Sequence, residues 1–215
     1  MLVLAFCQDS RAARMDRPRL LDPHLEYLRT VMSSIRLAAP LATADGAAIS
    51  DDDRLMGSIF AIEAPSPAAA REIMGLDPYT KGGVWSSVVF FNVVERYGEW
   101  TEGARYRGSP RLYAAFFTVS GAVETRIDDS FVAHREYMLG LSTPSFLGGK
   151  LAADGTMGDE IDQPHWNSFD VFGAESLKQA RSLAAGDACV ARGSLTAQVM
   201  AIPLAVGLWS NTGSR

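Results

Sequence analysis

Two short stretches of the chain, DPHLEYLRT and AHREYMLGL, place histidine, glutamate and tyrosine in the same order. The histidines are His24 and His134, which are 134 − 24 = 110 positions apart in a chain with only three histidines. A frame that holds over many further positions is typical of a duplicated domain. The same offset relates Ser58 to Ser168, Ala64 to Ala174, Ala70 to Ala180, Asp77 to Asp187 and Gly83 to Gly193.

A repeat of this length limits how the chain divides. A chain of 215 residues that is 47% hydrophobic can bury one generous core or two small ones. The stretch GEWTEGARYRGSP is rich in glycine and ends in proline, which is typical of a linker. We therefore expect a first domain over residues 1–97, a linker over 98–110, a diverged second domain over 111–205 and a C-terminal tail over 206–215.

Charge and composition exclude several classes of protein. The net charge of −5 gives no basic surface for a polyanion, so we expect no nucleic-acid partner. No apolar run approaches the roughly 18 residues of a membrane span, and the apolar start favours a first strand over a signal peptide. Two cysteines without a CxxC pattern suit a reducing compartment. We expect a cytoplasmic protein that does not bind membranes.

Hydrophobic periodicity predicts the same order of elements, βαββαβ, in each half. In the first half, Asp22 and Pro23 have the residue types of an N-cap and a first helical position. This order is that of a ferredoxin-like unit, with two helices on one face of a four-stranded antiparallel sheet. We expect an α+β fold in which two tandem units bury their open sheet faces against each other. The elements predicted for the first half are strands over 2–7, 37–43, 57–64 and 87–94, and helices over 22–36 and 67–76.

One histidine and one aspartate of each half face inward on separate helices. His24 continues the apolar stripe of Leu21 and Leu28, and Asp77 follows the buried face of the next helix. An inward carboxylate at the C-terminal end of a helix needs a cation or hydrogen-bond donors. Near a helix N-terminus, the dipole opposes protonation of His24, whereas a carboxylate favours it. His134 and Asp187 repeat the arrangement.

Such a pair supports two interpretations. A neutral imidazole oriented by a carboxylate can act as a general base. Alternatively, the pair is a satisfied polar contact that ties two helices together, because structural ion pairs perturb side chains in the same way. Periodicity alone leaves both open.

The segments DPHLEYL and DPYTKGGV, together with a strand that begins GSIF, resemble the YCII-related family. The resemblance covers residues 1–97 and extends weakly over 111–205. It implies a dimeric α+β barrel, usually built from two chains and here from the two halves of one. It also implies a His/Asp pair in a pocket of each unit, formed by His24 with Asp77 and by His134 with Asp187.

The second half departs from the family pattern. It has GDACVARG where the first half has LDPYTKGG, so the proline and the tyrosine are lost. Its first helix has Val132 and Ala133 in place of the Asp-Pro start. We expect an intact first site and a diverged second site.

The resemblance implies chemistry like that of dehydrochlorinase-like and muconolactone isomerase-like relatives. We expect a cofactor-independent lyase or isomerase that acts on a small cyclic oxygenated metabolite, with the His/Asp pair as acid and base. Candidate binding groups are Arg14 or Arg17, expected in the loop before the helix, for an anionic oxygen, and Ser58 as a hydrogen-bond donor. Tyr79 and Trp85 are candidate walls of the pocket. The alternative for the arginines is an ordinary solvated charge, and the alternative for the two aromatic residues is packing in the core.

Other chemistries lack a pattern. The histidines and acids do not have the spacing of a metal site, and no nucleotide-binding or serine-hydrolase motif is present. We expect neither metal nor cofactor. Cys189, beside Asp187, is more typical of a small buried hydrophobe than of a nucleophile. The alternative to an enzyme is a barrel that binds a small ligand or assists assembly. In either case the chain is a candidate homodimer.

Overall fold

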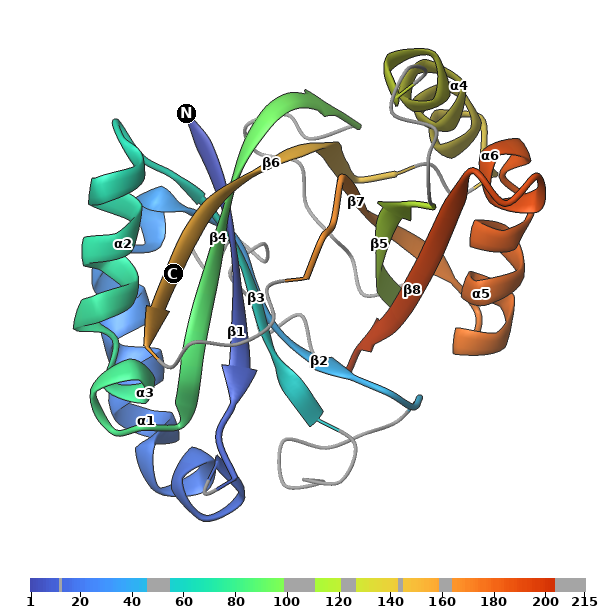
Figure 1. The fold of residues 1–215 in the computed structure, drawn as a ribbon. Helices are drawn as coiled ribbons and strands as arrows, with labels where there is room; N and C mark the ends of the chain where they lie inside the picture. Colours follow the sequence, from blue (N-terminus) through green and yellow to red (C-terminus); the bar gives the residue numbers. More distant parts are fainter. Residues whose placement is uncertain are drawn as a thin grey trace, which may run out of the picture. The chain divides into compact units, whose positions relative to one another are not determined.

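The computed structural model divides the chain into two compact units (Figure 1). The first unit comprises Met1–Asn92, Ala153–Gln163 and Pro203–Arg215, and the second comprises Val93–Ala152 and Pro164–Ile202. The side chains of residues 14 and 127–130 are outside the described part. The residues that the structure describes are 1–11, 13–45, 55–98, 111–120, 127–142, 145–158 and 164–203.

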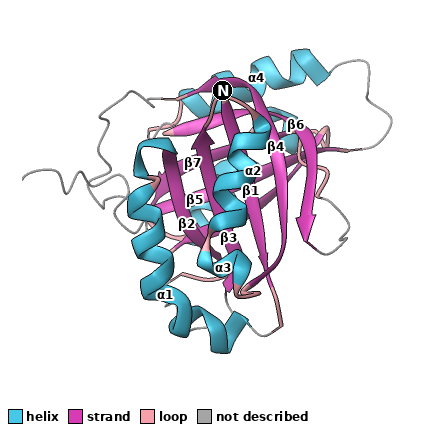
Figure 2. Ribbon diagram, turned by 90° about the vertical axis from the view of Figure 1, so that its left-hand side faces the viewer, coloured by secondary structure: helices cyan, strands magenta, loops and turns pink. Residues whose placement is uncertain are grey.

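The first unit contains an antiparallel sheet in which β1 lies between β3 and β4, and β2 lies beyond β3. Helices α1 and α2 lie across one face of these strands (Figure 2). This is the strand order of a ferredoxin-like unit. The elements are β1 (Leu2–Asp9), α1 (Ala13–Thr30), the short 3-10 helix η1 (Met32–Ser34), β2 (Ile35–Ala42), β3 (Leu55–Glu63), α2 (Pro67–Leu76), α3 (Pro78–Lys81) and β4 (Trp85–Tyr97).

The second unit has the same strand order, with β5 between β7 and β8, and β6 beyond β7. The predicted βαββαβ order is therefore confirmed in each unit, with one additional short helix before the last strand. The domain boundaries and the closure of the two sheets into a barrel stay predictions. The elements are β5 (Arg111–Val119), α4 (Ile127–Leu139), β6 (Leu147–Gly158), β7 (Ser168–Ala174), α5 (Leu177–Ala185), α6 (Ala188–Ala191) and β8 (Leu195–Ile202).

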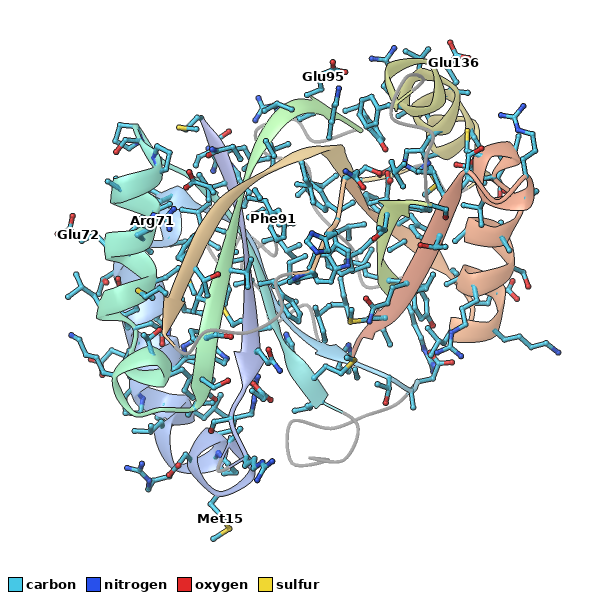
Figure 3. All side chains as sticks on the ribbon, viewed as in Figure 1. Met15, Arg71, Glu72, Phe91, Glu95 and Glu136 are labelled. Carbon is cyan, nitrogen blue, oxygen red and sulfur yellow. The ribbon has the colours of Figure 1, made fainter. Side chains whose placement is uncertain are left out.

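The core of the first unit lies between its sheet and its helices. Alternate residues of β1 point toward the helices, as the two-residue period of a strand requires. Val3, Ala5 and Cys7 belong to this core, where they are fully buried with Met74 of α2. On the opposite face of α2, Glu72 points outward (Figure 3). Arg71 of the same helix forms an ion pair with Asp154. The amphipathic pattern of α2 thus predicts its packing correctly.

The predicted start of the first helix is wrong. Helix α1 begins at Ala13, so Asp22 and Pro23 lie inside it rather than at its N-terminus. An interior proline costs about 3 kcal/mol in an isolated helix. Here the first turns are held by tertiary contacts, because Ala13 and Leu20 pack on the core. His24 consequently lies in the second half of α1, and the predicted opposition of the helix N-terminus to its protonation does not apply.

The surroundings of Asp77 also differ from the prediction. Pro78 ends α2 but starts α3, and Asp77 lies between them as the N-cap of α3. Its carboxylate accepts a hydrogen bond of 2.8 Å from the backbone N–H of Tyr79. Asp77 is thus the C-cap of α2, as predicted, and also the N-cap of α3, whose favourable N-terminus meets the charge. Among the described residues, no helix is both long enough and apolar enough to cross a membrane.

Candidate functional site

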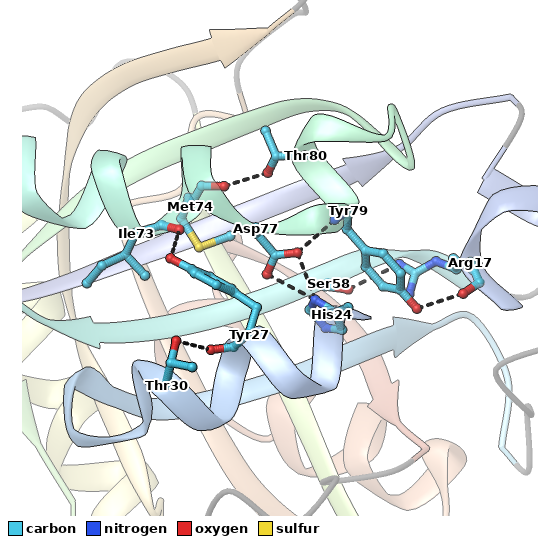
Figure 4. A network of polar contacts seen from close by, with 10 residues as sticks. All are labelled: Arg17, His24, Tyr27, Thr30, Ser58, Ile73, Met74, Asp77, Tyr79 and Thr80. Carbon is cyan, nitrogen blue, oxygen red and sulfur yellow. Dashed lines mark hydrogen bonds and ion pairs between the residues drawn. The ribbon is translucent and has the colours of Figure 1, made fainter. Parts of the chain in front are cut away.

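His24 and Asp77 are in contact in the first unit (Figure 4). Nδ1 of His24 lies 2.8 Å from Oδ1 and 2.9 Å from Oδ2 of Asp77. Both residues are buried, with His24 7% and Asp77 1% exposed. A carboxylate at Nδ1 favours a proton on that nitrogen, which fixes the tautomer and leaves the lone pair of a neutral ring on Nε2.

Nε2 of His24 has no hydrogen-bond partner among the residues that the structure describes. The ring itself is held from the side. Tyr79 stacks on it with centroids 4.0 Å apart and planes 5° apart. Trp85 meets it edge-on at 5.7 Å. The imidazole is therefore fixed in orientation while one nitrogen is left to interact with a ligand.

The Tyr79 hydroxyl and the Cys7 thiol near His24 are held in their neutral forms. Burial raises the pKa of Tyr79 to about 12, with Asp77 acting in the same direction and Arg17 against it. Burial, and then the charge of Asp77, raise the pKa of the Cys7 thiol well above its usual range. Neither a tyrosinate nor a thiolate forms readily here, so His24 is the candidate proton acceptor of this cluster.

Arg17 reaches the site from α1, not from a loop as predicted. Its Nε and Nη2 donate to Oδ2 and Oδ1 of Asp9 at 2.8 and 2.6 Å. Nη2 also donates to Oγ of Ser58 at 3.1 Å, and the hydroxyl of Tyr79 donates to the carbonyl of Arg17 at 3.0 Å. Because Asp9 neutralises the guanidinium, the structure favours a positioning role over direct capture of an anion. The side chain of Arg14 lies outside the described residues.

Ser58 lies inside β3, which begins at Leu55, rather than at the start of the strand. Its hydroxyl accepts from Arg17 and keeps its own proton for another acceptor. Trp85 is 4% exposed, and its indole N–H has no hydrogen-bond partner among the described residues. The site residues predicted for the first half, apart from Arg14, thus form one cluster with His24.

His134 and Asp187 are also in contact, but their surroundings are closed. Nδ1 of His134 lies 2.6 Å from Oδ2 of Asp187. Its Nε2 lies 3.1 Å from Oδ2 of Asp170 and 3.3 Å from the hydroxyl of Tyr97. That hydroxyl donates to Asp170 at 2.9 Å, and His134 is fully buried. Both imidazole nitrogens are therefore occupied within the unit.

This arrangement stabilises an imidazolium. Burial alone would lower the pKa of His134, but hydrogen bonds to Asp170 and Asp187 and their charges outweigh it and raise that pKa to about 9. Burial also acts to raise the pKa of Asp187, yet the hydrogen bonds from His134 and from the backbone N–H of Cys189 lower it. Burial raises the pKa of Asp170. A cation flanked by two carboxylates is poorly suited to accept a proton near neutrality.

Sequence reasoning missed Asp9, Tyr97 and Asp170. Asp170 stands alone as an acid in the buried strand NSFDVFGA, where an uncompensated charge is costly, and this signal could have revealed it. At the offset of 110 it corresponds to Phe60, so the two histidines have different neighbours at Nε2. Among the described residues, no group of three or more His, Cys, Asp or Glu side chains has the arrangement of a metal site.

Comparisons with known proteins agree with the fold. A family model, the YCII-related domain, matches residues 1–94. A putative monooxygenase from Fusobacterium nucleatum is 10% identical with a TM-score of 0.54, and the match covers 94% of this chain and 90% of that one. A chlorite dismutase mutant from Candidatus Nitrospira defluvii is 10% identical with a TM-score of 0.55 and coverages of 97% and 93%. These two likenesses show a shared α+β fold.

A 5-chloro-2-hydroxyhydroquinone dehydrochlorinase from Burkholderia phenoliruptrix is 27% identical, with a TM-score of 0.38. The match covers 42% of this chain and 90% of that one. A comparison with curated protein sequences gave no match. The family model matches the same part of the chain that carries the motifs around His24 and Asp77, so residues 1–94 are similar to a YCII-related domain.

Proposed function

We propose that the first unit contains the active site of a cofactor-independent lyase or isomerase, and that His24 is the general base of this site. The observation that carries this proposal is the asymmetry of the His24 ring. Nδ1 is hydrogen-bonded to both carboxylate oxygens of Asp77, whereas Nε2 has no partner among the described residues. A general base needs this combination of a fixed tautomer and an open lone pair.

The proposed reaction starts with the transfer of a proton from an activated C–H or O–H group of the substrate to Nε2. Asp77 stabilises the imidazolium that forms, and its own hydrogen bond from Tyr79 keeps the carboxylate in place. In a lyase, the electron pair released forms a double bond while a leaving group departs with its bonding pair. In an isomerase, the imidazolium returns the proton to a different carbon.

The surroundings of His24 support a flat, oxygenated substrate. Trp85 and Phe60 both present rings edge-on near the imidazole, with centroids at 5.7 and 6.4 Å. The unpartnered indole N–H of Trp85 offers a donor for a substrate oxygen. Arg17 and Ser58 act through their hydrogen bond as part of the frame that holds this cluster. The substrate class is therefore a small ring that carries hydroxyl or carbonyl groups.

Proton transfer to His24 can be tested without knowledge of the complete reaction. The purified protein is incubated in deuterated water with chlorinated and unchlorinated hydroxyhydroquinones and with small unsaturated lactones. NMR then follows deuterium uptake at carbon, and a chloride electrode follows elimination. We expect turnover of at least one compound class, and we expect His24→Gln to slow it by about a hundredfold to ten-thousandfold, the usual contribution of a general base.

The matched control is His165→Gln, because His165 is exposed and in neither cluster. This variant should retain the wild-type rate. If saturable binding of a tested compound were found without any exchange or elimination above that of His24→Gln, the proposal would fail. The alternative of a non-catalytic small-molecule-binding or assembly protein would then be favoured.

We further propose that the two units arose by duplication and that the second lost catalysis. Corresponding contacts support this. The hydroxyl of Tyr27 donates to the carbonyl of Ile73 at 2.7 Å, and that of Tyr137 donates to Leu183 at 2.8 Å. Related sequences test the idea, since residues 110 apart should match more often than residues at neighbouring offsets. A catalytic role of His134 and Asp187 is not supported by their closed contacts. A cytoplasmic location and a homodimer stay predictions.

A further inference from the structure

A hollow opens beside His134 within the second unit. Its surface is mainly apolar, and it contains about 270 Å³ of empty space, part of which is open to solvent. Both nitrogens of His134 are hydrogen-bonded elsewhere, so this ring contributes a wall rather than a base. The lining residues are Val119, Phe131, His134, Lys150, Asn167, Ser168 and Leu195.

The offset of 110 explains why a hollow exists here. Leu195 corresponds to Trp85, and Val119 corresponds to Asp9. In the first unit, the indole of Trp85 packs against Tyr79 and Phe60, with ring centroids at 5.3 and 5.5 Å. Leucine is smaller than the tryptophan to which it corresponds, and valine cannot form the ion pair that Asp9 makes with Arg17. The second unit thus has space where the first has side chains.

Ser168 supplies a polar group that nothing in the described part of the chain satisfies. Its counterpart Ser58 accepts a hydrogen bond from Arg17 at 3.1 Å. The sequence has isoleucine, not arginine, at the position that corresponds to Arg17, which is residue 127. Ser168 is 2% exposed, lines the hollow and has no hydrogen-bond partner among the described residues. A buried hydroxyl in this state gains from a partner in the hollow.

Lys150 brings a positive charge to the same wall. Lys150 and Ser168 are directly opposed on β6 and β7, so their side chains lie on the same face of the sheet as neighbours. The ammonium group of Lys150 lies 5.8 Å from the centre of the Phe131 ring. A cation and a hydroxyl donor therefore border a hollow whose remaining lining is mainly apolar.

We propose that this hollow is a second ligand site, which binds a short aliphatic monocarboxylate. The carboxylate accepts hydrogen bonds from Lys150 and Ser168, and the alkyl chain lies against Val119, Phe131 and Leu195. This site does not depend on the chemistry proposed for His24. Its occupant is recognised by one anionic head and a short apolar tail, which is the combination that the lining offers.

Titration of the full chain with propionate and with butyrate, followed by the backbone NMR signals of Lys150, Phe131 and Ser168, tests this proposal. We expect saturable binding, and we expect propionamide, which has the same shape without the charge, to bind at least about tenfold more weakly. Leu195→Trp restores the first-unit residue and should abolish binding by filling the hollow. Lys150→Gln should weaken binding at least about tenfold.

The control for general electrostatics is Lys178→Gln, which removes an exposed lysine of α5 and should leave the affinity unchanged. Circular dichroism shows whether each variant is folded. If Leu195→Trp does not fold, Ser168→Ala takes its place and should weaken binding at least about threefold. The proposal is overturned by an absence of saturation at tens of millimolar, by equal binding of propionamide, or by folded Leu195→Trp and Lys150→Gln variants with wild-type affinity.

Discussion

The two histidine clusters have the same kind of contact at Nδ1 of the imidazole and different surroundings at Nε2. In both units, an aspartate that caps a short helix holds Nδ1 of the histidine, through Asp77 at 2.8 Å and through Asp187 at 2.6 Å. At Nε2, His24 has no described partner, whereas His134 meets Asp170 at 3.1 Å. The same frame thus supports an open imidazole in one unit and an enclosed imidazolium in the other.

A single exchange in a strand accounts for much of this difference. Position 60 carries phenylalanine, whose ring only packs near the imidazole, and position 170 carries an aspartate that binds it. An added carboxylate makes the protonated ring stable and consumes the nitrogen that a base requires. The fold therefore holds a His/Asp pair in both units although only His24 has Nε2 without a described partner, and the pair alone does not identify a catalytic unit.

The largest expected difference concerns the two aspartates that orient the histidines. Asp77→Asn should lower the rate of proton exchange about a hundredfold to ten-thousandfold, because an amide cannot stabilise the imidazolium and favours the wrong tautomer. Asp187→Asn should leave the rate unchanged within about twofold at a temperature where the chain is folded. Steady-state rates of both variants measure the contrast, and equal losses would contradict it.

The free energy of unfolding should depend more on the histidine of the second unit than on that of the first. His134→Leu leaves Asp170 and Asp187 buried without their cation, and we expect a loss of about 3–5 kcal/mol in the free energy of unfolding. His24→Leu leaves Asp77 with its hydrogen bond from Tyr79, and we expect a loss of about 1–2 kcal/mol. Urea denaturation measures both. A larger loss for His24→Leu would show that the enclosed cluster is not the more structural one.

The pH dependence of stability should reveal the imidazolium of His134. Its folded-state pKa of about 9 lies above the unfolded value of about 6.5, so the stabilisation is complete below pH 6.5 and is lost as the pH rises through about 9. The shift corresponds to about 3 kcal/mol. Asp187, whose pKa is lowered, adds stability that disappears only in acid. Between pH 6 and 9.5, the midpoint temperature of thermal unfolding should therefore fall more steeply with pH for the wild type than for His134→Gln. Parallel dependences of the two midpoints on pH would contradict this.

The smallest effects should be equal in the two units, since they belong to the shared frame. Tyr27→Phe and Tyr137→Phe each remove one hydrogen bond from a hydroxyl to the carbonyl of a neighbouring helix. Each should cost about 1 kcal/mol. Urea denaturation of the two variants measures these values. Losses that differ by more than about 1 kcal/mol would show that the frame is not equivalent in the two units.

The inward orientation of His24 and Asp77 follows from local patterns and was predictable from the sequence. The helical spacing around His24 and the Asp-Pro-Tyr motif indicate that both side chains face the covered side of the sheet, and they do. The start of α1 was not predictable in this way, because Pro18 and Pro23 normally mark a helix boundary and here tertiary packing overrides them. Arg17 was consequently expected in a loop.

The closure of the second cluster could not be predicted because it depends on contacts between distant segments. Tyr97 lies at the end of β4, and nothing in its local sequence relates it to His134 of α4, 134 − 97 = 37 positions away. Asp170 offered a signal as a lone acid in a buried strand, but which residue it meets is set by the register of β7 in the sheet. Register and long-range placement are properties that single-sequence patterns do not fix.

The most direct test of the central claim compares the accessibility of the two imidazoles. Diethyl pyrocarbonate acylates unprotonated imidazole nitrogens that reagents can reach, and mass spectrometry of peptides from the native full chain locates each adduct among the three histidines. We predict that His165, which is exposed, and His24, which is buried but has no described partner at Nε2, both react, while His134 reacts only after unfolding. Modification of native His134 as fast as His24, or a His24 that stays unmodified while His165 reacts, would contradict the proposed division between an open and a closed site.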